Sequence, residues 1–225
     1  MQGERLAEPT TAIWAMRVDM DSVRRVFASQ ITGMPAAARG SAPDPFAAPH
    51  ERHAVVAALL REGRDGVEVL LIQRAEHELD PWSGHMALPG GHGDPDDDGL
   101  VATAVREISE EVGLDLLEHA ELLGRLPEVQ ARPRELTIFP LVFALVAGPE
   151  PVPNPSEVQR IVWARIDHLR APAARTGYEI TMRQQRHRFP AFDVDGHTVW
   201  GLTYRILLDL LTLVEPMSPT GPEPR

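Results

Sequence analysis

Residues 90–114 read GGHGDPDDDGLVATAVREISEEVGL, and this stretch decides the fold. Its second half has the spacing of an amphipathic helix. The apolar residues share one helical face: Val101, Ala104, Val105, Ile108 and Val112. Gly113 ends the predicted helix Leu100–Val112, and Asp97 or Asp98 is the candidate N-cap. The stretch therefore predicts a helix that buries one face against a sheet.

Three glutamates, Glu107, Glu110 and Glu111, stand at positions i, i+3 and i+4 of this helix. They share the face opposite the apolar stripe. Crowded carboxylates repel unless a cation lies among them, and oxygen-rich clusters suit Mg²⁺ and similar hard cations. Arg106, four residues before Glu110, can neutralise part of this charge and hold one carboxylate in place.

A solvated acidic face is the ordinary interpretation of such a pattern taken alone. Two features favour a metal site instead. The turn at residues 89–91, Pro-Gly-Gly, lets backbone approach a ligand closely. The buried stripe also fixes the helix, so the acidic face has a defined direction.

A calcium-binding EF-hand loop is a competing interpretation of the aspartate run. Asp94, Asp96, Asp98 and Gly99 fit its first half, but the twelfth position, which requires Glu, is Val105. The aspartates are better explained as a cap that favours the helix dipole.

The remaining chain predicts a mixed order of strands and helices. Strands are expected at residues 53–60, 67–72, 83–88, 121–129, 136–146 and 158–164, with another closing at Val199. Helices are expected at Asp21–Gln30, with Asp19 or Asp21 as cap, and at Tyr204–Leu213. This order predicts an α/β sandwich with helices on both faces of a mixed sheet. Residues 1–50 are predicted to be an extension and linker, residues 51–214 one domain, and residues 215–225 a flexible tail.

Composition excludes several classes of function. The 225 residues carry a net charge of −11, which disfavours binding to extended nucleic acid. The chain has no cysteine, so disulfides and zinc–thiolate sites are excluded. The sequence shows no signal peptide and no apolar run long enough for a membrane span. We therefore expect a cytoplasmic protein that does not bind membranes.

The segment Arg106–Leu114 resembles the second half of the Nudix box, R-E-U-x-E-E-x-G-U, in which U is apolar. The first half, G-x5-E-x7, matches less closely. Counting back from Arg106 places Asp98 at the Glu position and His92 at the Gly position. Alternatively, Gly91 and Asp97 match with one extra residue.

Within that superfamily, the chain resembles the coenzyme A pyrophosphatases. The pattern runs from Leu70–Ala75 to Gly84–Gly91, and 14 residues separate Gly91 from Arg106. This subgroup has an internal Arg between these segments, whereas residues 78–82 here read ELDPW. Trp82 is a half-buried structural residue in one interpretation and stacks on a base or ring in the other.

The resemblance implies a Nudix-like α/β/α sandwich and metal-dependent cleavage of a pyrophosphate bond in a nucleoside diphosphate linked to another group. The cofactor would be Mg²⁺ or Mn²⁺, and the partner a small nucleotide-like molecule. The implied metal ligands are Glu107, Glu110, Glu111 and the Gly90 carbonyl. Arg106 joins the three glutamates as a catalytic residue, and the implied substrate-binding residues are Arg74, Gly91 and Glu157. Glu157 is also the candidate general base from a loop.

Several features leave alternatives open. The substrate is coenzyme A in one hypothesis and ADP-ribose, a dinucleotide or an oxidised nucleoside triphosphate in another. A third hypothesis is a nucleotide-binding module without catalysis, which the intact glutamates disfavour. His85, His92 and His197 are candidate pocket residues. The basic stretch Arg183, Arg186, His187 and Arg188 is expected to be a solvated loop, and Ile13, Trp14 and Met16 are a candidate homodimer contact.

Overall fold

The computed structural model describes residues 17–28, 46, 52–77, 82–131, 136–146, 148–182 and 185–215. The predicted first helix is α1 (Met20–Phe27), and its N-cap is Asp19, whose carboxylate accepts a hydrogen bond from the Ser22 amide at 2.7 Å. Val23 and Phe27 are fully buried, so α1 packs into the core although residues 1–50 were predicted as a peripheral extension. The candidate dimer residues Ile13, Trp14 and Met16 lie outside the described residues.

Two buried strands form a hairpin, as predicted, and this hairpin lies at the centre of the main sheet. β1 (His53–Gly63) and β2 (Gly66–Arg74) pair antiparallel and are joined by a tight turn at residues 64–65. β1 also pairs in parallel with β7 (Leu136–Leu145), whose residues are almost all buried. Parallel strands buried on both faces read as continuous apolar runs, which explains why both were recognisable in the sequence.

The other strands of this sheet pair antiparallel, so the sheet is mixed and the predicted fold class is confirmed. They are β3 (Met86–Ala87), β4 (Gly90–His92), β5 (Ala120–Arg125), β6 (Val129–Ala131) and β8 (Val158–Arg165). The order is β3-β2-β1-β7-β5, with β4 on β1, β6 on β7 and β8 on β2. The single strand predicted at residues 121–129 is wrong, because residues 126–128 interrupt it and separate β5 from β6.

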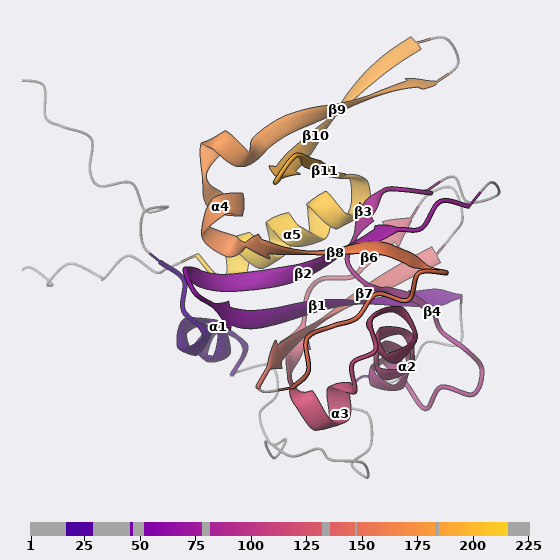
Figure 1. The fold of residues 1–225 in the computed structure, drawn as a ribbon, viewed down its shortest axis with the longest axis vertical. Coiled ribbons are helices and arrows are strands. Elements are labelled where there is room, and N and C mark those ends of the chain that lie inside the picture. The colour runs from indigo at the N-terminus through magenta and orange to yellow at the C-terminus, as the bar shows by residue number, and fades with distance from the viewer. Residues whose placement is uncertain are drawn as a thin grey trace, which may run out of the picture.

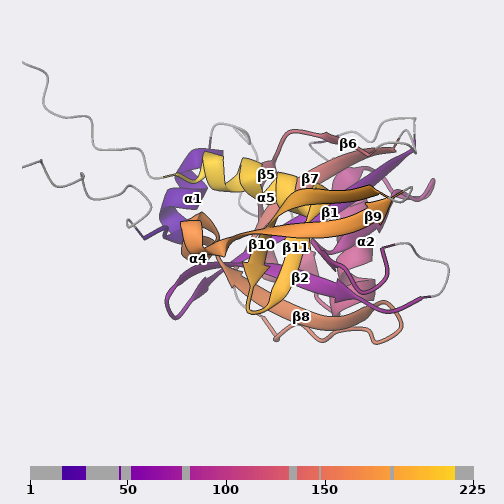
Figure 2. The ribbon, with the colours of Figure 1, turned by 90° about the horizontal axis from the view of Figure 1, so that it is seen from above.

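Helices cover both faces of the main sheet (Figures 1 and 2). One face packs against α2 (Leu100–Val112) and α3 (Leu116–His119). The opposite face packs against α1, α4 (Ile166–Arg170) and α5 (Gly201–Leu213). The helix predicted at residues 100–112 thus has the bounds of α2, whereas α5 begins three residues before its predicted start.

A second sheet of three antiparallel strands follows α4 and a short 3₁₀ helix (Pro172–Ala174). Its strands are β9 (Arg175–Met182), β10 (Gln185–Val194) and β11 (His197–Trp200), and the β9–β10 hairpin extends away from the main body in Figure 1. Arg186, His187 and Arg188 lie on β10, so the prediction of a basic loop there is wrong for these three residues. Arg183 is outside the described residues.

None of the described helices has the length and apolar character needed to cross a membrane. The cytoplasmic location stays a prediction, as do the domain boundaries at residues 51 and 214.

Candidate active site

Glu111, in the last turn of α2, is buried although it carries a carboxylate. Its exposed fraction is 3%, and its Oε2 accepts a hydrogen bond from the Gly90 amide at 2.7 Å. The prediction that all three glutamates lie opposite the apolar stripe is therefore wrong for Glu111, which turns inward to β4. Gly90 has a φ of +138°, and a Cβ there would collide with the Val55 carbonyl, so glycine lets this part of β4 pack closely against β1.

Glu107 lies one turn earlier on α2 and contacts the next glycine of β4. A Cβ on Gly91 would lie 2.5 Å from the Glu107 carboxylate, so the absence of a side chain makes room for this group. The Glu107 side chain is only 12% exposed. The two adjacent glycines of β4 thus each receive one carboxylate of α2.

Arg106 donates hydrogen bonds to four residues around Glu107. Its Nε and Nη2 donate to Asp97 at 3.2 and 3.0 Å, and Nη1 donates to Glu107 at 2.8 Å. Nη2 also donates to the His92 carbonyl at 2.8 Å, and a longer contact of 3.4 Å reaches Glu110. Arg106 therefore holds Glu107 in place, as predicted, while Glu110 remains half exposed at its side chain.

Asp97 is the acidic residue that pairs with this arginine, whereas Asp98 is exposed. The structure thus favours the alignment of the first half of the box through Gly91 and Asp97. The predicted capping role is wrong, because the N-cap of α2 is Gly99 and makes no side-chain cap bond. Asp97 accepts instead from Thr103 Oγ1 at 2.8 Å. Burial opposes ionisation, but hydrogen bonds from Arg106, the Asp94 amide and Thr103 keep the pKa of Asp97 below its ordinary value.

Burial raises the pKa of two carboxylates of α2, those of Glu107 and Glu111. Burial is the largest cause and raises the pKa of Glu111 to about 8, although the Gly90 hydrogen bond and the charge of Arg74 oppose this. Burial also raises the pKa of Glu107, while Arg106 lowers it. Charge from Glu157 contributes to the raised pKa of both glutamates. The site therefore gathers more negative charge than its own arginines neutralise.

Glu157 reaches this site because a loop covers the C-terminal end of α2. The amides of Val152 and Asn154 donate to the Val112 and Glu111 carbonyls, both at 2.9 Å. The Asn154 side chain donates to the Glu110 carbonyl at 3.1 Å, and its own carbonyl accepts from the Glu157 amide at 3.0 Å. Asn154 was missed in the sequence, because an Asn in a Pro-rich loop shows no sign of its distant partner.

Arg74 ends β2, as predicted, and its charge acts on Glu111. Its amide donates to the His85 carbonyl at 3.0 Å, and the next amide, of Ala75, donates to the Glu157 carbonyl at 2.8 Å. The three predicted substrate-binding residues, Arg74, Gly91 and Glu157, therefore all lie around the two buried glutamates.

The histidines and aspartates have other environments. His85 lies among aromatic rings, His92 contributes its carbonyl to Arg106, and His197 pairs with Val194 in the second sheet. The Asp94 carboxylate accepts from the Asp96 amide at 2.9 Å in a local turn. In the part of the chain that the structure describes, no three His, Asp or Glu side chains converge closely enough to hold a metal by themselves. Neither an EF-hand loop nor the three glutamates form such a group.

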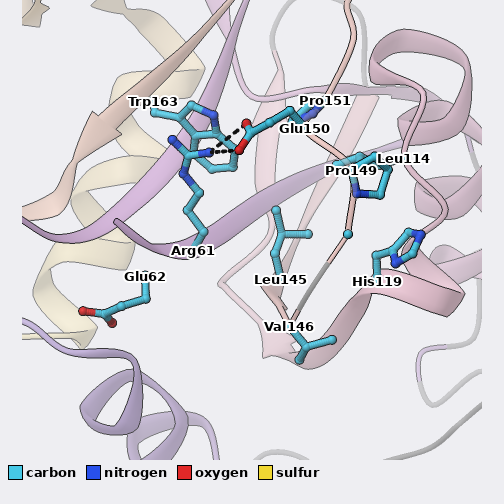
Figure 3. Close-up of a pocket in the computed structure, with 11 residues that line it drawn as sticks. Arg61, Glu62, Leu114, His119, Leu145, Val146, Pro149, Glu150, Pro151 and Trp163 are labelled. Carbon is cyan, nitrogen blue, oxygen red and sulfur yellow. Dashed lines mark hydrogen bonds and ion pairs between the residues drawn. The ribbon is translucent and has the colours of Figure 1, made fainter. Parts of the chain in front are cut away.

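A cavity of about 240 Å³ lies at the other end of β1 (Figure 3). Arg61 on its wall is six residues beyond Val55, about 20 Å along the strand. Arg61 stacks over Trp163 at 3.8 Å and donates to Glu150 at 3.0 Å and to Glu68 at 2.8 Å. Its charge is thus already paired, and the cavity is separate from the glutamates of α2.

Together the fold and the site define an α/β/α sandwich in which one helix presents buried carboxylates to a glycine turn. The NUDIX domain family matches residues 51–184, and the chain belongs to this family. The predicted superfamily and its hydrolase class are confirmed.

Three known proteins illustrate the similarity. An uncharacterized Nudix hydrolase of Photorhabdus laumondii, NudL, is 31% identical over 146 residues, which is 65% of this chain and 77% of that protein. Nudix hydrolase 22, chloroplastic, of Arabidopsis thaliana is 30% identical, and the match covers 75% of this chain but only 57% of the relative. A C. elegans Ap4A hydrolase in a binary complex has a TM-score of 0.43 at 20% identity, covering 51% of this chain and 80% of that one.

Proposed function

We propose that the protein is a metal-dependent hydrolase that cleaves the pyrophosphate bond of a nucleoside diphosphate linked to another group. The observation that carries this proposal is the burial of Glu111 beside Glu107, within reach of the Glu157 charge. Burying like charges together is costly unless a cation offsets them. The burial of this group therefore supports a chemical role for it rather than a stabilising one.

The side chains present fit a hard divalent cation, Mg²⁺ or Mn²⁺. Carboxylate and carbonyl oxygens are the ligands that such ions prefer. Glu107, Glu111, Glu110 and the Gly90 carbonyl are the proposed ligands, and the half-exposed Glu110 would have to turn from Arg106 to join them. When bound, the ion would polarise the phosphate oxygens and lower the pKa of the attacking water.

The other residues of the site have roles that follow from their positions. Arg106 orients Glu107 through its bond of 2.8 Å. Arg74 lies close enough to Glu111 for its charge to act on that carboxylate. From this position the guanidinium would bind a phosphate oxygen of the substrate. Glu157 accepts the proton of the attacking water, and the bare backbone of Gly91 lets the substrate approach closely.

Coenzyme A is the first substrate to test, since the resemblance in segments 70–75 and 84–91 points to that subgroup. The purified protein is incubated with Mg²⁺ or Mn²⁺ and a panel of coenzyme A, ADP-ribose, diadenosine polyphosphates and oxidised nucleoside triphosphates, and the products are separated by chromatography. We expect cleavage at the pyrophosphate bond, and a loss of at least about 100-fold in the Glu111→Gln variant.

Conversion of coenzyme A to 3′,5′-ADP and 4′-phosphopantetheine would support the subgroup. Selective cleavage of another compound would support the proposed reaction and identify that compound, instead of coenzyme A, as the substrate. Equal activity of the wild type and Glu111→Gln would contradict the proposed site, and no cleavage at all would favour the binding module.

A further inference from the structure

A group of rings, here called the aromatic cluster, joins the two sheets beside the proposed site. Its members are Trp82, His85, Tyr178, Phe189 and Trp200. Trp200 is central, because Tyr178 stacks on it at 4.3 Å and 22°. The rings of His85, Phe189 and Trp82 lie 5.4, 5.7 and 6.2 Å from it. The rings come from the loop before β3 and from β9, β10 and β11, so the fold brings them together.

The aromatic cluster lies across the end of β2 from Glu157, whose charge acts on the carboxylates of α2. β2 has β3 on one side and β8 on the other. At the end of β2, the Arg74 amide donates to the His85 carbonyl on the β3 side. The next amide, of Ala75, donates to the Glu157 carbonyl on the β8 side. Glu157 and His85 are therefore about two strand spacings, ~10 Å, apart. A nucleotide whose phosphates lie at the carboxylates can reach the cluster with its base.

Trp82 is the most exposed ring of the cluster, with 49% of its surface exposed, whereas the other four rings are partly buried. It contacts His85 edge-on at 5.9 Å, and the His85 amide donates to the Trp82 carbonyl at 3.2 Å. The loop that carries this indole is thus anchored to the strand that ends at Arg74. Among the described residues, Trp82 is the one aromatic ring in the set of exposed large apolar side chains, and it is held beside the proposed site.

We propose that the aromatic cluster, with Trp82 as its outer ring, is the stacking surface for the nucleobase of the substrate. This inference rests on the proposed function and adds the part of the substrate that the cluster recognises. Planar aromatic side chains bind bases through their π-faces, whichever base is present. Stacking adds affinity without adding charge, which suits a site that already carries excess negative charge.

The test compares two ligands that share a non-hydrolysable diphosphate and differ in the nucleoside. Isothermal titration calorimetry with Mg²⁺ measures binding of α,β-methylene-ADP and of methylenediphosphonate. Trp82→Ala is expected to lower the affinity for α,β-methylene-ADP about 5- to 100-fold and to leave the affinity for methylenediphosphonate unchanged. Trp82→Phe keeps a ring and should retain most of the affinity. Trp163→Ala, which removes a tryptophan at the remote cavity, should change neither ligand.

The outcomes separate this inference from the proposed function. Unchanged nucleotide affinity in Trp82→Ala, with methylenediphosphonate still bound by the wild type and lost in Glu111→Gln, overturns the stacking surface and leaves the proposed function. Equal weakening of both ligands also overturns it, because the residue would then act on the phosphate site. A wild type that binds neither ligand contradicts both proposals.

Discussion

At the scale of single residues, Glu111 shows how a functional group can oppose folding. Its pKa in the folded protein is about 8, against an ordinary value of 4.5, with burial as the largest cause. The folded state therefore keeps a proton that the unfolded state releases between these two values. Without metal, we predict that the free energy of unfolding falls as pH rises from 4.5 to 8 and then levels, by up to a few kcal/mol.

This prediction is checked by urea denaturation in EDTA from pH 5 to pH 9. Glu111→Gln has no carboxyl to titrate, so its stability should fall less across this window and exceed that of the wild type at pH 8. Glu118→Gln, on the exposed side of α3, should follow the wild type. If the free energy of unfolding changed equally with pH in the wild type and in Glu111→Gln, the Glu111 pKa would not be raised.

Gly91 offers a test of the position of Glu107 that leaves the charge in place. Gly91→Ala places a Cβ 2.5 Å from the Glu107 carboxylate, and the side chain must move. Since displacement of about 1 Å in a catalytic group can cost about 100-fold, we predict a loss of that order in kcat/KM. Gly63→Ala is the matched control, because its Cβ would lie 2.5 Å from the Glu68 side chain, at the far end of β1. Equal activities of the two variants would refute the role of Glu107.

At the scale of elements, the loop at residues 152–157 joins α2 to the candidate base. Asn154 binds the Glu110 carbonyl with its side chain and the Glu157 amide with its backbone carbonyl. Asn154→Ala loses the side-chain bonds to the Glu110 carbonyl and to Ser156, which costs about 1 kcal/mol of stability, and it frees the loop before β8 from α2. We predict a fall in kcat of about tenfold, with the pH profile of kcat altered because Glu157 loses its position.

Thr212→Ala is a suitable comparison, because it also removes a side-chain bond to a helix carbonyl, that of Leu208 at 2.9 Å, on α5. Because Ala is the better helix former at this exposed position, Thr212→Ala should change stability little and activity not at all. A tenfold fall in kcat for both variants, or an unchanged pH profile in Asn154→Ala, would assign Asn154 a structural role only.

The same element scale explains what could be read from the sequence. α2, β1, β2 and β7 were predictable because their apolar residues follow a helical period or form buried runs. The β9–β10 hairpin was not, since most of its residues are exposed and no apolar alternation marks it. At the site, Arg106 and the glutamates lie within one contiguous motif. By contrast, the contacts of Asn154 with α2 and of Trp82 with Trp200 depend on distant segments, which no local pattern encodes.

At the scale of the whole molecule, the site ties together parts that are distant in the chain. The β4 glycines, α2, the end of β2 and the loop before β8 all meet at Glu107 and Glu111. A divalent cation bound there would stabilise the native arrangement and not the unfolded chain, so it would raise stability by mass action. At a concentration of about 100 times its dissociation constant, the gain is about 2.7 kcal/mol. For a domain of this size, we predict a rise in Tm of about 5–10 °C with Mn²⁺ or Mg²⁺.

The size of this rise should depend on pH in a direction fixed by Glu111. Because a metal binds the ionised carboxylate, below the pKa of about 8 the ion must first displace the proton. The metal-induced rise in Tm should therefore increase from pH 6 to pH 8 and change little above it. Scanning calorimetry with EDTA or with Mn²⁺ at each pH measures this difference. Glu111→Gln should lose most of the rise at every pH, whereas Glu118→Gln should keep it. A rise of the same size in Glu111→Gln would place the cation elsewhere on the molecule.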